Sequence, residues 1–308
     1  MKRNVAVVSS IGIYLLSSVT SVFVNKYVLM DGTVDTVLLI FIQHLSCLLP
    51  LHIFKTYFMG TQDKDGVQKQ NMGSLYEGFK HMWMIIISFN FTLIFGNTCL
   101  KYTNISSYQL ARSMTLPFNF LFSYFFFKQI NFTFMMTFAC MLVSVGFFVF
   151  SVDAISTNFK SVLYGTTVSI VQAIHLNLLK KKLMIYQNKT VMLYYNILYS
   201  SIILFIYLSI RGEFFSIFRW NHRVCFNLAL SCISSIFVTF SSFMCIHYTD
   251  NVVFNMFGNV KSTMQTFISK FYHAEQLNMY TLMGILFTTL GSFLYTYSSQ
   301  YAGKQKVR

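Results

Sequence analysis

Near the end of the chain, residues 251–272 have the sequence NVVFNMFGNVKSTMQTFISKFY, an apolar stretch of membrane-spanning length with Lys261 near its middle. Residues 105–127, ISSYQLARSMTLPFNFLFSYFFF, carry Arg112 in a similar setting. A charge at the centre of a membrane helix costs roughly 2.5 to 3.5 kcal/mol, so it persists where it faces a cavity or a partner. Because no Asp or Glu lies in the core of any such stretch, the sequence predicts an internal anion site. The alternative is that these cations snorkel to an interface or cap a helix, which is the favoured explanation for Lys270.

The composition around these stretches is that of a polytopic membrane protein. Of the 308 residues 55% are hydrophobic and 10% charged, and the mean hydropathy is +0.55. The net charge of +14 comes from Lys and Arg residues that fall mostly between apolar stretches, where they set orientation, so no nucleic-acid partner is expected. The six cysteines form no C-x-x-C pair, and no metal or cofactor is expected.

Windows of about 20 apolar residues predict an all-α protein with ten transmembrane helices in the lipid bilayer. The Lys and Arg distribution favours the side that holds both termini, which places both termini in the cytosol. The expected spans cover residues 5–24, 36–54, 82–100, 105–127, 132–151, 161–179, 191–210, 225–246, 251–272 and 279–300.

A weak internal repeat organises these spans into two halves. Residues 102–104, Tyr-Thr-Asn, align with residues 248–250, Tyr-Thr-Asp, at an offset of 146 residues (248 minus 102). The offset equals five predicted spans, so the second copy would enter the membrane inverted. Inverted repeats are a transporter architecture with the substrate site between the halves. We therefore expect five-helix repeats at 1–152 and 153–308, with Arg112 and Lys261 on equivalent helices facing one cavity.

The residue types at this expected site suit a phosphate or a diphosphate. Lys261 follows Gly258 and Asn259, and glycine lets a ligand or a helix approach the backbone. Arg112 offers a planar fork that matches phosphate oxygens. Carriers driven by protons or sodium usually need a membrane carboxylate, so its absence from the span cores favours exchange of one anion for another.

A polar and aromatic cluster on the seventh span is a candidate nucleobase site. Tyr194, Tyr195 and Asn196 combine ring faces with an amide that both donates and accepts hydrogen bonds. A tyrosine belt at the membrane interface explains the same residues equally well, and both explanations stay open.

At these residues the chain resembles the nucleotide-sugar transporters of the drug/metabolite transporter superfamily, and within it the GDP-fucose transporter group. Gly258 to Lys261 is similar to the glycine-to-lysine motif whose lysine meets the diphosphate, and Tyr194-Tyr195-Asn196 to the segment that reads guanine. Other matching residues are Ser21 to Tyr27, Asn97 to Tyr102, Tyr108, Arg112, Ser113, Asn119, Ser123, Tyr124, Lys128 and Gln129.

The resemblance implies a multi-pass Golgi or endoplasmic reticulum protein that is not an enzyme. It would exchange a cytosolic GDP-sugar, GDP-fucose first and GDP-mannose next, for a lumenal nucleoside monophosphate. Ile197 replaces a second Asn that GDP-sugar carriers often have, which keeps UDP-sugar and phosphorylated-metabolite carriers open. A homodimer is compatible, and the tail Lys304-Gln305-Lys306-Val307-Arg308 resembles a dilysine retrieval signal. A membrane transferase or a receptor is the alternative from another class.

Overall fold

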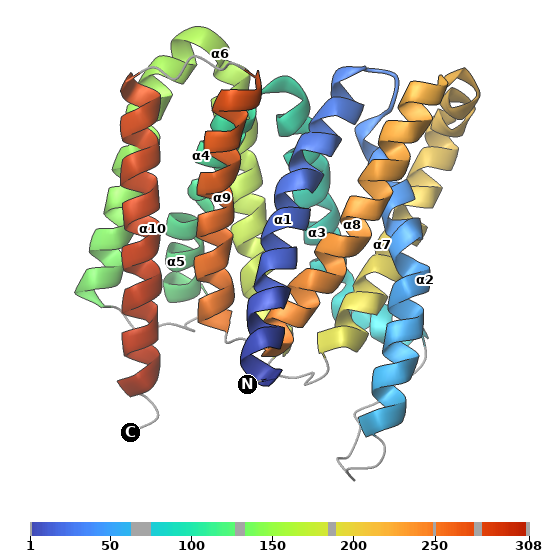
Figure 1. Cartoon of the computed structure of the whole chain (residues 1–308), viewed down its shortest axis with the longest axis horizontal. Helices are drawn as coiled ribbons and strands as arrows, with labels where there is room; N and C mark the ends of the chain where they lie inside the picture. The colour runs from blue at the N-terminus through green and yellow to red at the C-terminus, as the bar shows by residue number, and fades with distance from the viewer. Residues whose placement is uncertain are drawn as a thin grey trace.

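The computed structural model describes residues 2–62, 75–126, 133–183, 189–248, 251–273 and 279–305, and within these ranges every regular element is a helix. Figure 1 shows how they are arranged, with the start of α1 and the end of α10 at the same end of the molecule. The helices are α1 (Lys2–Met30), α2 (Thr36–Gln62), α3 (Leu75–Tyr102), α4 (Ile105–Ser113), α5 (Thr115–Phe125), α6 (Phe134–Leu183), α7 (Lys189–Arg211), the 3₁₀ helix η2 (Glu213–Arg219), α8 (His222–Tyr248), α9 (Asn251–His273) and α10 (Met279–Gln305).

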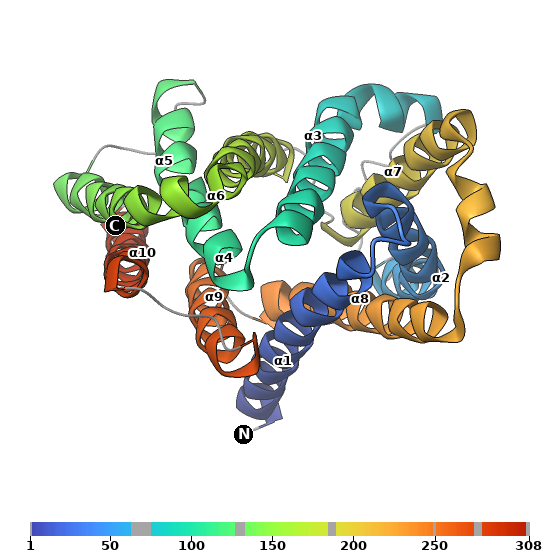
Figure 2. The same cartoon turned by 90° about the horizontal axis from the view of Figure 1, so that it is seen from above.

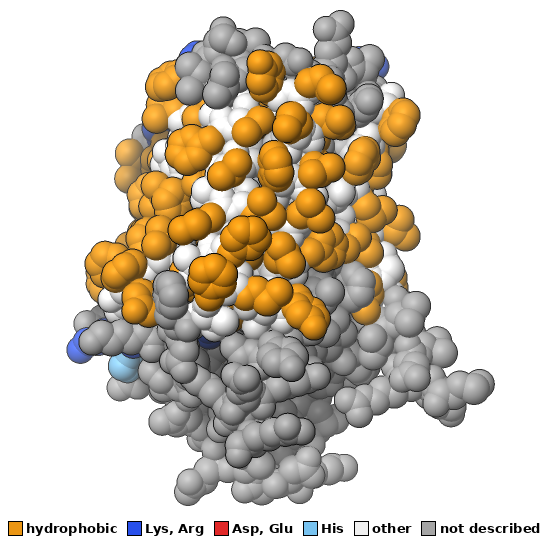
Figure 3. Space-filling model, turned by 90° about the vertical axis from the view of Figure 1, so that its left-hand side faces the viewer, with side chains coloured by type: hydrophobic (Ala, Val, Ile, Leu, Met, Phe, Trp, Pro, Cys, Tyr) orange, Lys and Arg blue, Asp and Glu red, His pale blue; other side chains and the backbone are white. Residues whose placement is uncertain are grey.

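The length and composition of the helices confirm an all-α polytopic membrane protein. Seven stretches of the described helices are long and apolar enough to cross a membrane. Figure 3 shows apolar side chains spread over the face on the side of α6 and α10. Exposed side chains form one helical stripe along the first half of α6: Phe134, Phe138, Met141, Val145 and Phe148. A stripe of this size and spacing suits contact with lipid rather than water.

The predicted fifth and sixth spans belong to one helix, α6, instead of two. A straight helix of its 50 residues would be about 75 Å long, more than twice the roughly 30 Å of a bilayer core. Figure 1 shows that α6 instead turns over at the top of the molecule and runs back. Its two candidate spans, Phe134–Ser151 and Val162–Lys182, lie on either side of this bend. The chain therefore reverses where the sequence predicted a boundary, without a loop.

The predicted fourth span is two helices, because α4 ends at Ser113 and α5 begins at Thr115. Pro117 has no N–H to bond to Ser113 and lies in the first turn of α5, where this loss costs little. The chain bends around Met114, whose amide bonds back to the carbonyl of Ala111 at 3.4 Å. The interruption lies two residues after Arg112.

The helices form two groups that meet at α1 and α3. Figures 1 and 2 show α10, α9, α4, α5 and the bend of α6 on one side, with α2, α7 and α8 on the other. Within the first group, α4 presses directly on α6: a Cβ atom built on Gly165 would lie only 2.0 Å from the Cβ of Ala111. The backbone around Arg112 is therefore held against α6 by a contact that only glycine permits.

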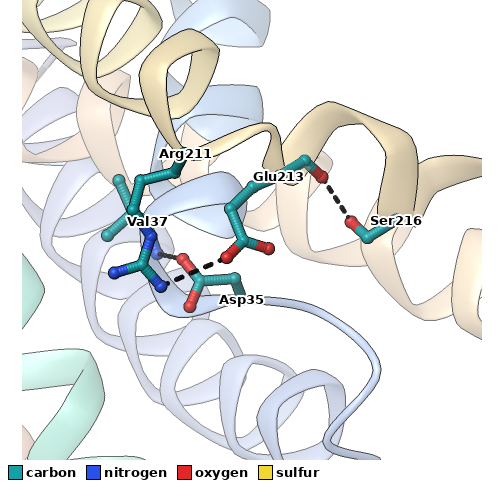
Figure 4. Close-up of polar contacts among 5 residues, drawn as sticks. All are labelled: Asp35, Val37, Arg211, Glu213 and Ser216. Atoms are coloured by element: carbon teal, nitrogen blue, oxygen red, sulfur yellow. Dashed lines mark hydrogen bonds and ion pairs between the residues drawn. The ribbon is translucent and has the colours of Figure 1, made fainter.

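Charged residues form polar contacts at the end of the molecule opposite the two chain termini. Asp35 caps α2 by accepting a 2.8 Å hydrogen bond from the amide of Val37, and Arg211 pairs with Glu213 at 3.3 Å (Figure 4). Gly212 between them has a φ of +67°, which glycine adopts without strain. These contacts end α7 and start the turn into α8.

Candidate functional site

Arg112 lies in the last turn of α4, where two side chains fix its guanidinium. Its Nε donates to Oε1 of Gln172 on α6, and one terminal nitrogen donates to the hydroxyl of Tyr108, both at 3.1 Å. A guanidinium has five N–H donors. The others have no hydrogen-bond partner among the described residues, and no described carboxylate pairs with this charge. Arg112 is thus oriented by neutral groups while much of its fork stays available.

Lys261, in the middle of α9, has a positive charge with no hydrogen bond or ion pair to any described residue. Its ammonium lies 5.6 Å from the ring centroid of Tyr14 on α1, a cation–π distance. Arg112, which carries the same charge, lies on the neighbouring helix α4. Two positive charges held in this way in a membrane protein favour an anion between them.

Arg112 and Lys261 line the same cavity, which has a volume of about 360 Å³. The described lining contains no Asp or Glu. Gly258 opens onto the cavity, and a Cβ atom placed on it would meet nothing within 4 Å. The remaining lining residues are Tyr14, Gln109, Leu110, Ser113, Thr115, Leu116, Asn119, Gln172, Leu176, Ser262, Thr263, Thr266, Ile285, Thr288, Thr289, Ser292, Tyr295 and Thr296.

Buried amides tie the helices around this cavity together. Gln109 on α4 donates to Oε1 of Gln265 on α9, whose own amide donates to the carbonyl of Ser18 on α1 at 2.9 Å. At the break between α4 and α5, the hydroxyl of Ser169 donates to the carbonyl of Ala111 at 2.7 Å. A carbonyl at the end of α4 thus has a hydrogen-bond partner inside the protein, as the backbone of a discontinuous membrane helix requires.

Tyr194, Tyr195 and Asn196 are not among the residues that line the cavity. They lie on α7, which packs on α2 and α3. The ammonium of Lys55 lies 4.5 Å and 4.4 Å from the ring centroids of Tyr194 and Tyr195, and Asn196 is buried with no partner for its Oδ1 among the described residues. The structure thus places this cluster apart from the two cations.

Some of the expected residues lie outside the described part of the structure, and one, Lys26, lies in an unexpected setting. The side chains of Asn259 and Lys270 lie outside the described ones, as do residues 306–308 of the basic tail. Lys26, which follows the expected first span at 5–24, is buried at the end of α1 and donates to the carbonyls of Leu100 and Thr103 at 2.7 Å and 2.6 Å. Its charge is satisfied by the carbonyl end of α3.

Sequence reasoning missed Tyr14, Gln172 and the hydroxyl groups of α10. Each is a polar residue within an apolar span, which is a real but common signal, because most such groups bond to a neighbouring helix. Only the helix packing shows that Gln172 faces Arg112 and that Tyr14 lies under Lys261.

No family model matches the chain. It is 26% identical to GDP-fucose transporter 1 of Dictyostelium discoideum over 209 residues, 66% of this chain and 56% of that protein. The Golgi GDP-fucose transporter of Drosophila melanogaster is 26% identical over 276 residues, 85% of this chain and 81% of that protein.

UDP-xylose transporter 3 of Arabidopsis thaliana is 24% identical over 223 residues, 68% of this chain and 60% of that protein. The resemblance drawn from the sequence is therefore confirmed: the curated relatives of this chain are nucleotide-sugar transporters.

Proposed function

We propose that this protein is a carrier that exchanges a nucleotide sugar for a nucleoside monophosphate across a Golgi or endoplasmic reticulum membrane. The observation that carries the proposal is the meeting of Arg112 and Lys261 in one cavity whose described lining holds no carboxylate. In this proposal Lys261 contacts the diphosphate as a point charge and Arg112 clamps it through its planar fork. Gly258 lets the substrate approach the backbone of α9.

Alternating access between two inverted halves is the transport mechanism that we propose. Helix packing supports it, because α1 packs along α8 and α3 packs along α6. Ser17 contacts Ser241 across the first pair and Ser88 contacts His175 across the second, both at 3.1 Å. If the second repeat begins at residues 162–182 of α6, this segment corresponds to α1, and α8 corresponds to α3. The packing of α1 on α8 and of α3 on α6 is then the same contact, made once by each half. The substrate would then lie between α4 and α9, where repeats of this kind bind their cargo.

The GDP-sugars, GDP-fucose first and GDP-mannose second, are the proposed substrates because two of the relatives described above are named for GDP-fucose. Tyr194, Tyr195 and Asn196 would contact the base. UDP-sugars are the second candidate, supported by the relative named for UDP-xylose. A phosphorylated metabolite is the third, since the cation cavity is lined without any of these three residues.

A thermal-shift screen of the purified protein tests this proposal. A ligand at 100 times its Kd stabilises a protein by about 2.7 kcal/mol. We expect nucleoside diphosphates and nucleotide sugars to raise the melting temperature, with guanine compounds ahead of uracil compounds, while nucleosides without phosphate leave it unchanged. Equal protection by inorganic phosphate and simple sugar phosphates would favour a phosphorylated-metabolite carrier. No protection by any phosphate compound would overturn the proposal.

Preloading proteoliposomes with GMP is expected to accelerate uptake of labelled nucleotide sugar several-fold over empty vesicles. The physical reason is that no described carboxylate near the cavity is available to carry a coupling ion, so the return step needs a counter-anion. Guanosine, which lacks the phosphate, is the matched control and should not accelerate uptake. Equal uptake by empty and GMP-loaded vesicles would contradict exchange.

Replacing Asn196 with alanine is expected to lower the preference for guanine over uracil compounds by roughly threefold to tenfold, because one base-edge hydrogen bond is lost. Competition by GDP and UDP against labelled substrate measures this ratio. Asn227→Ala on α8 is the matched control. If Asn196→Ala leaves the ratio unchanged, base recognition lies elsewhere.

A further inference from the structure

The cavity has a second set of polar lining residues, which we call the α5–α10 wall: Thr115 and Asn119 on α5 with Ser292 and Tyr295 on α10. Figures 1 and 2 show α10 on one side of α9 and α1 on the other. Lys261 is close to Tyr14 on α1, so the α10 part of the wall lies on the other side of α9 from the Tyr14 contact. None of its four side chains is charged.

The hydroxyl groups of α10 differ in whether they donate a hydrogen bond to the backbone of their own helix. Thr288 and Thr289 donate to the carbonyls of Ile285 and Leu286 in the preceding turn, at 3.1 Å and 3.0 Å. The side-chain hydroxyls of Ser292 and Tyr295 have no hydrogen-bond partner among the described residues. The ring of Tyr295 packs edge-on against Phe120 with centroids 6.2 Å apart, which fixes where its hydroxyl lies. Ser292 and Tyr295 therefore line the cavity with hydroxyl groups that bond to no described residue.

The two wall residues on α5 are also incompletely satisfied. Asn119 accepts a 2.7 Å hydrogen bond on its Oδ1 from Asn177, which leaves the two donors of its Nδ2 without a partner in the described structure. Ser123 donates in turn to Asn177 and fixes the orientation of that amide. Thr115 has a buried hydroxyl oxygen with no hydrogen-bond partner among the described residues. An unmet buried hydroxyl such as that of Thr115 is costly. Together with the unpartnered groups of Asn119, Ser292 and Tyr295 on the same cavity, it indicates a polar ligand.

We infer that the α5–α10 wall binds the hydroxyl groups of the sugar, while the diphosphate of the same molecule occupies Arg112 and Lys261. This inference rests on the proposed function. Donors on Asn119 and donor–acceptor hydroxyls on the other three residues match the mixed hydrogen bonding of sugar hydroxyls. Because the described wall has neither a cation nor a carboxylate, it selects a neutral sugar over an acidic or an amino sugar.

The inference separates the two cargoes of an exchanger. A nucleotide sugar fills both the cation site and the wall, whereas a nucleoside monophosphate or diphosphate has no sugar beyond its phosphates and leaves the wall empty. A substitution in the wall should therefore weaken one cargo and spare the other, which a general loss of folding or of phosphate binding does not do.

The test measures the affinity of GDP, GDP-fucose, UDP and UDP-xylose for the wild type and for the double variant Ser292→Ala/Tyr295→Phe. Two lost hydrogen bonds are expected to weaken the nucleotide sugars by about five- to fiftyfold and the free diphosphates less than twofold. Tyr297→Phe, an exposed tyrosine of α10, is the matched control. Asn119→Ala on α5 provides a second variant, with the same selective loss expected.

Sugar charge is tested on the wild type with UDP-xylose against UDP-glucuronic acid, two sugars that differ by one carboxylate. We expect UDP-xylose to bind more tightly, and equal or tighter binding of the acid would overturn selection for a neutral sugar. If the wall variants weaken GDP and GDP-fucose equally, or neither, the sugar assignment fails while phosphate binding stands. If the wild type binds no nucleotide at all, the proposed function itself fails.

Discussion

Replacing Lys261 with methionine is expected to abolish transport and to weaken binding of GDP and nucleotide sugars by at least about 30-fold, since losing a close charge contact costs roughly 2 to 5 kcal/mol. The same variant is expected to raise the melting temperature of the empty protein. Its ammonium has no hydrogen bond or counter-charge in the described structure and shares its cavity with the like charge of Arg112, so methionine removes an unfavourable charge and keeps most of the volume.

These opposite effects distinguish a binding residue from a structural one. A lysine that held the fold together would lower the melting temperature when removed. Lys160→Met is the matched control, because Lys160 is an exposed lysine beside the ring of Tyr102 and lies outside the cavity. Near-normal GDP binding by Lys261→Met would remove Lys261 from the proposed site.

Replacing Arg112 with lysine is expected to weaken diphosphate binding by about 10- to 100-fold, although the charge is kept. Lysine cannot reproduce the planar fork, and a charge-assisted hydrogen bond contributes roughly 1.5 to 3 kcal/mol. The contacts to Gln172 and Tyr108, which aim the guanidinium, are lost as well. Titration with GDP and GMP measures the effect, and we expect the preference for diphosphate over monophosphate to shrink.

Arg211→Lys tests whether any loss of a guanidinium has this effect. Arg211 is exposed and pairs with Glu213 (Figure 4), and neither residue lines the cavity. The control variant should bind GDP as the wild type does. Wild-type transport by Arg112→Lys would reduce Arg112 to a structural charge held by Gln172.

The sequence was sufficient to predict that Arg112 and Lys261 share a cavity, because an unpaired charge inside a membrane span has few tolerable surroundings. It also predicted most of the span boundaries, since hydrophobic length is a strong signal. The interruption at Met114 had a visible cause in Pro117, yet an apolar stretch of this length still matched a single helix. The continuous path of α6 depends on how the chain bends, which hydropathy does not encode.

The partners of the site were harder to predict than its charges. Gln172 and Asn119 are ordinary amides in the sequence, and their importance comes from neighbours on other helices. The contact of the Tyr194 and Tyr195 rings with Lys55 was likewise not predicted, and their role at a base site stays a prediction. Composition and spacing identify which side chains are unusual, whereas packing decides which of them face one another.

Arg112 and Lys261 carry two positive charges beside the interruption between α4 and α5, and no described carboxylate neutralises them. A carrier that changed its conformation with an empty cavity would move both uncompensated charges within the low-dielectric interior of the bilayer. A bound dianion would make the binding site nearly neutral during the same change. If the protein works by the exchange proposed above, this electrostatic cost would disfavour reorientation of the empty carrier. In that case net loss of cargo without a counter-anion would be slow, because each cycle would need a loaded return step.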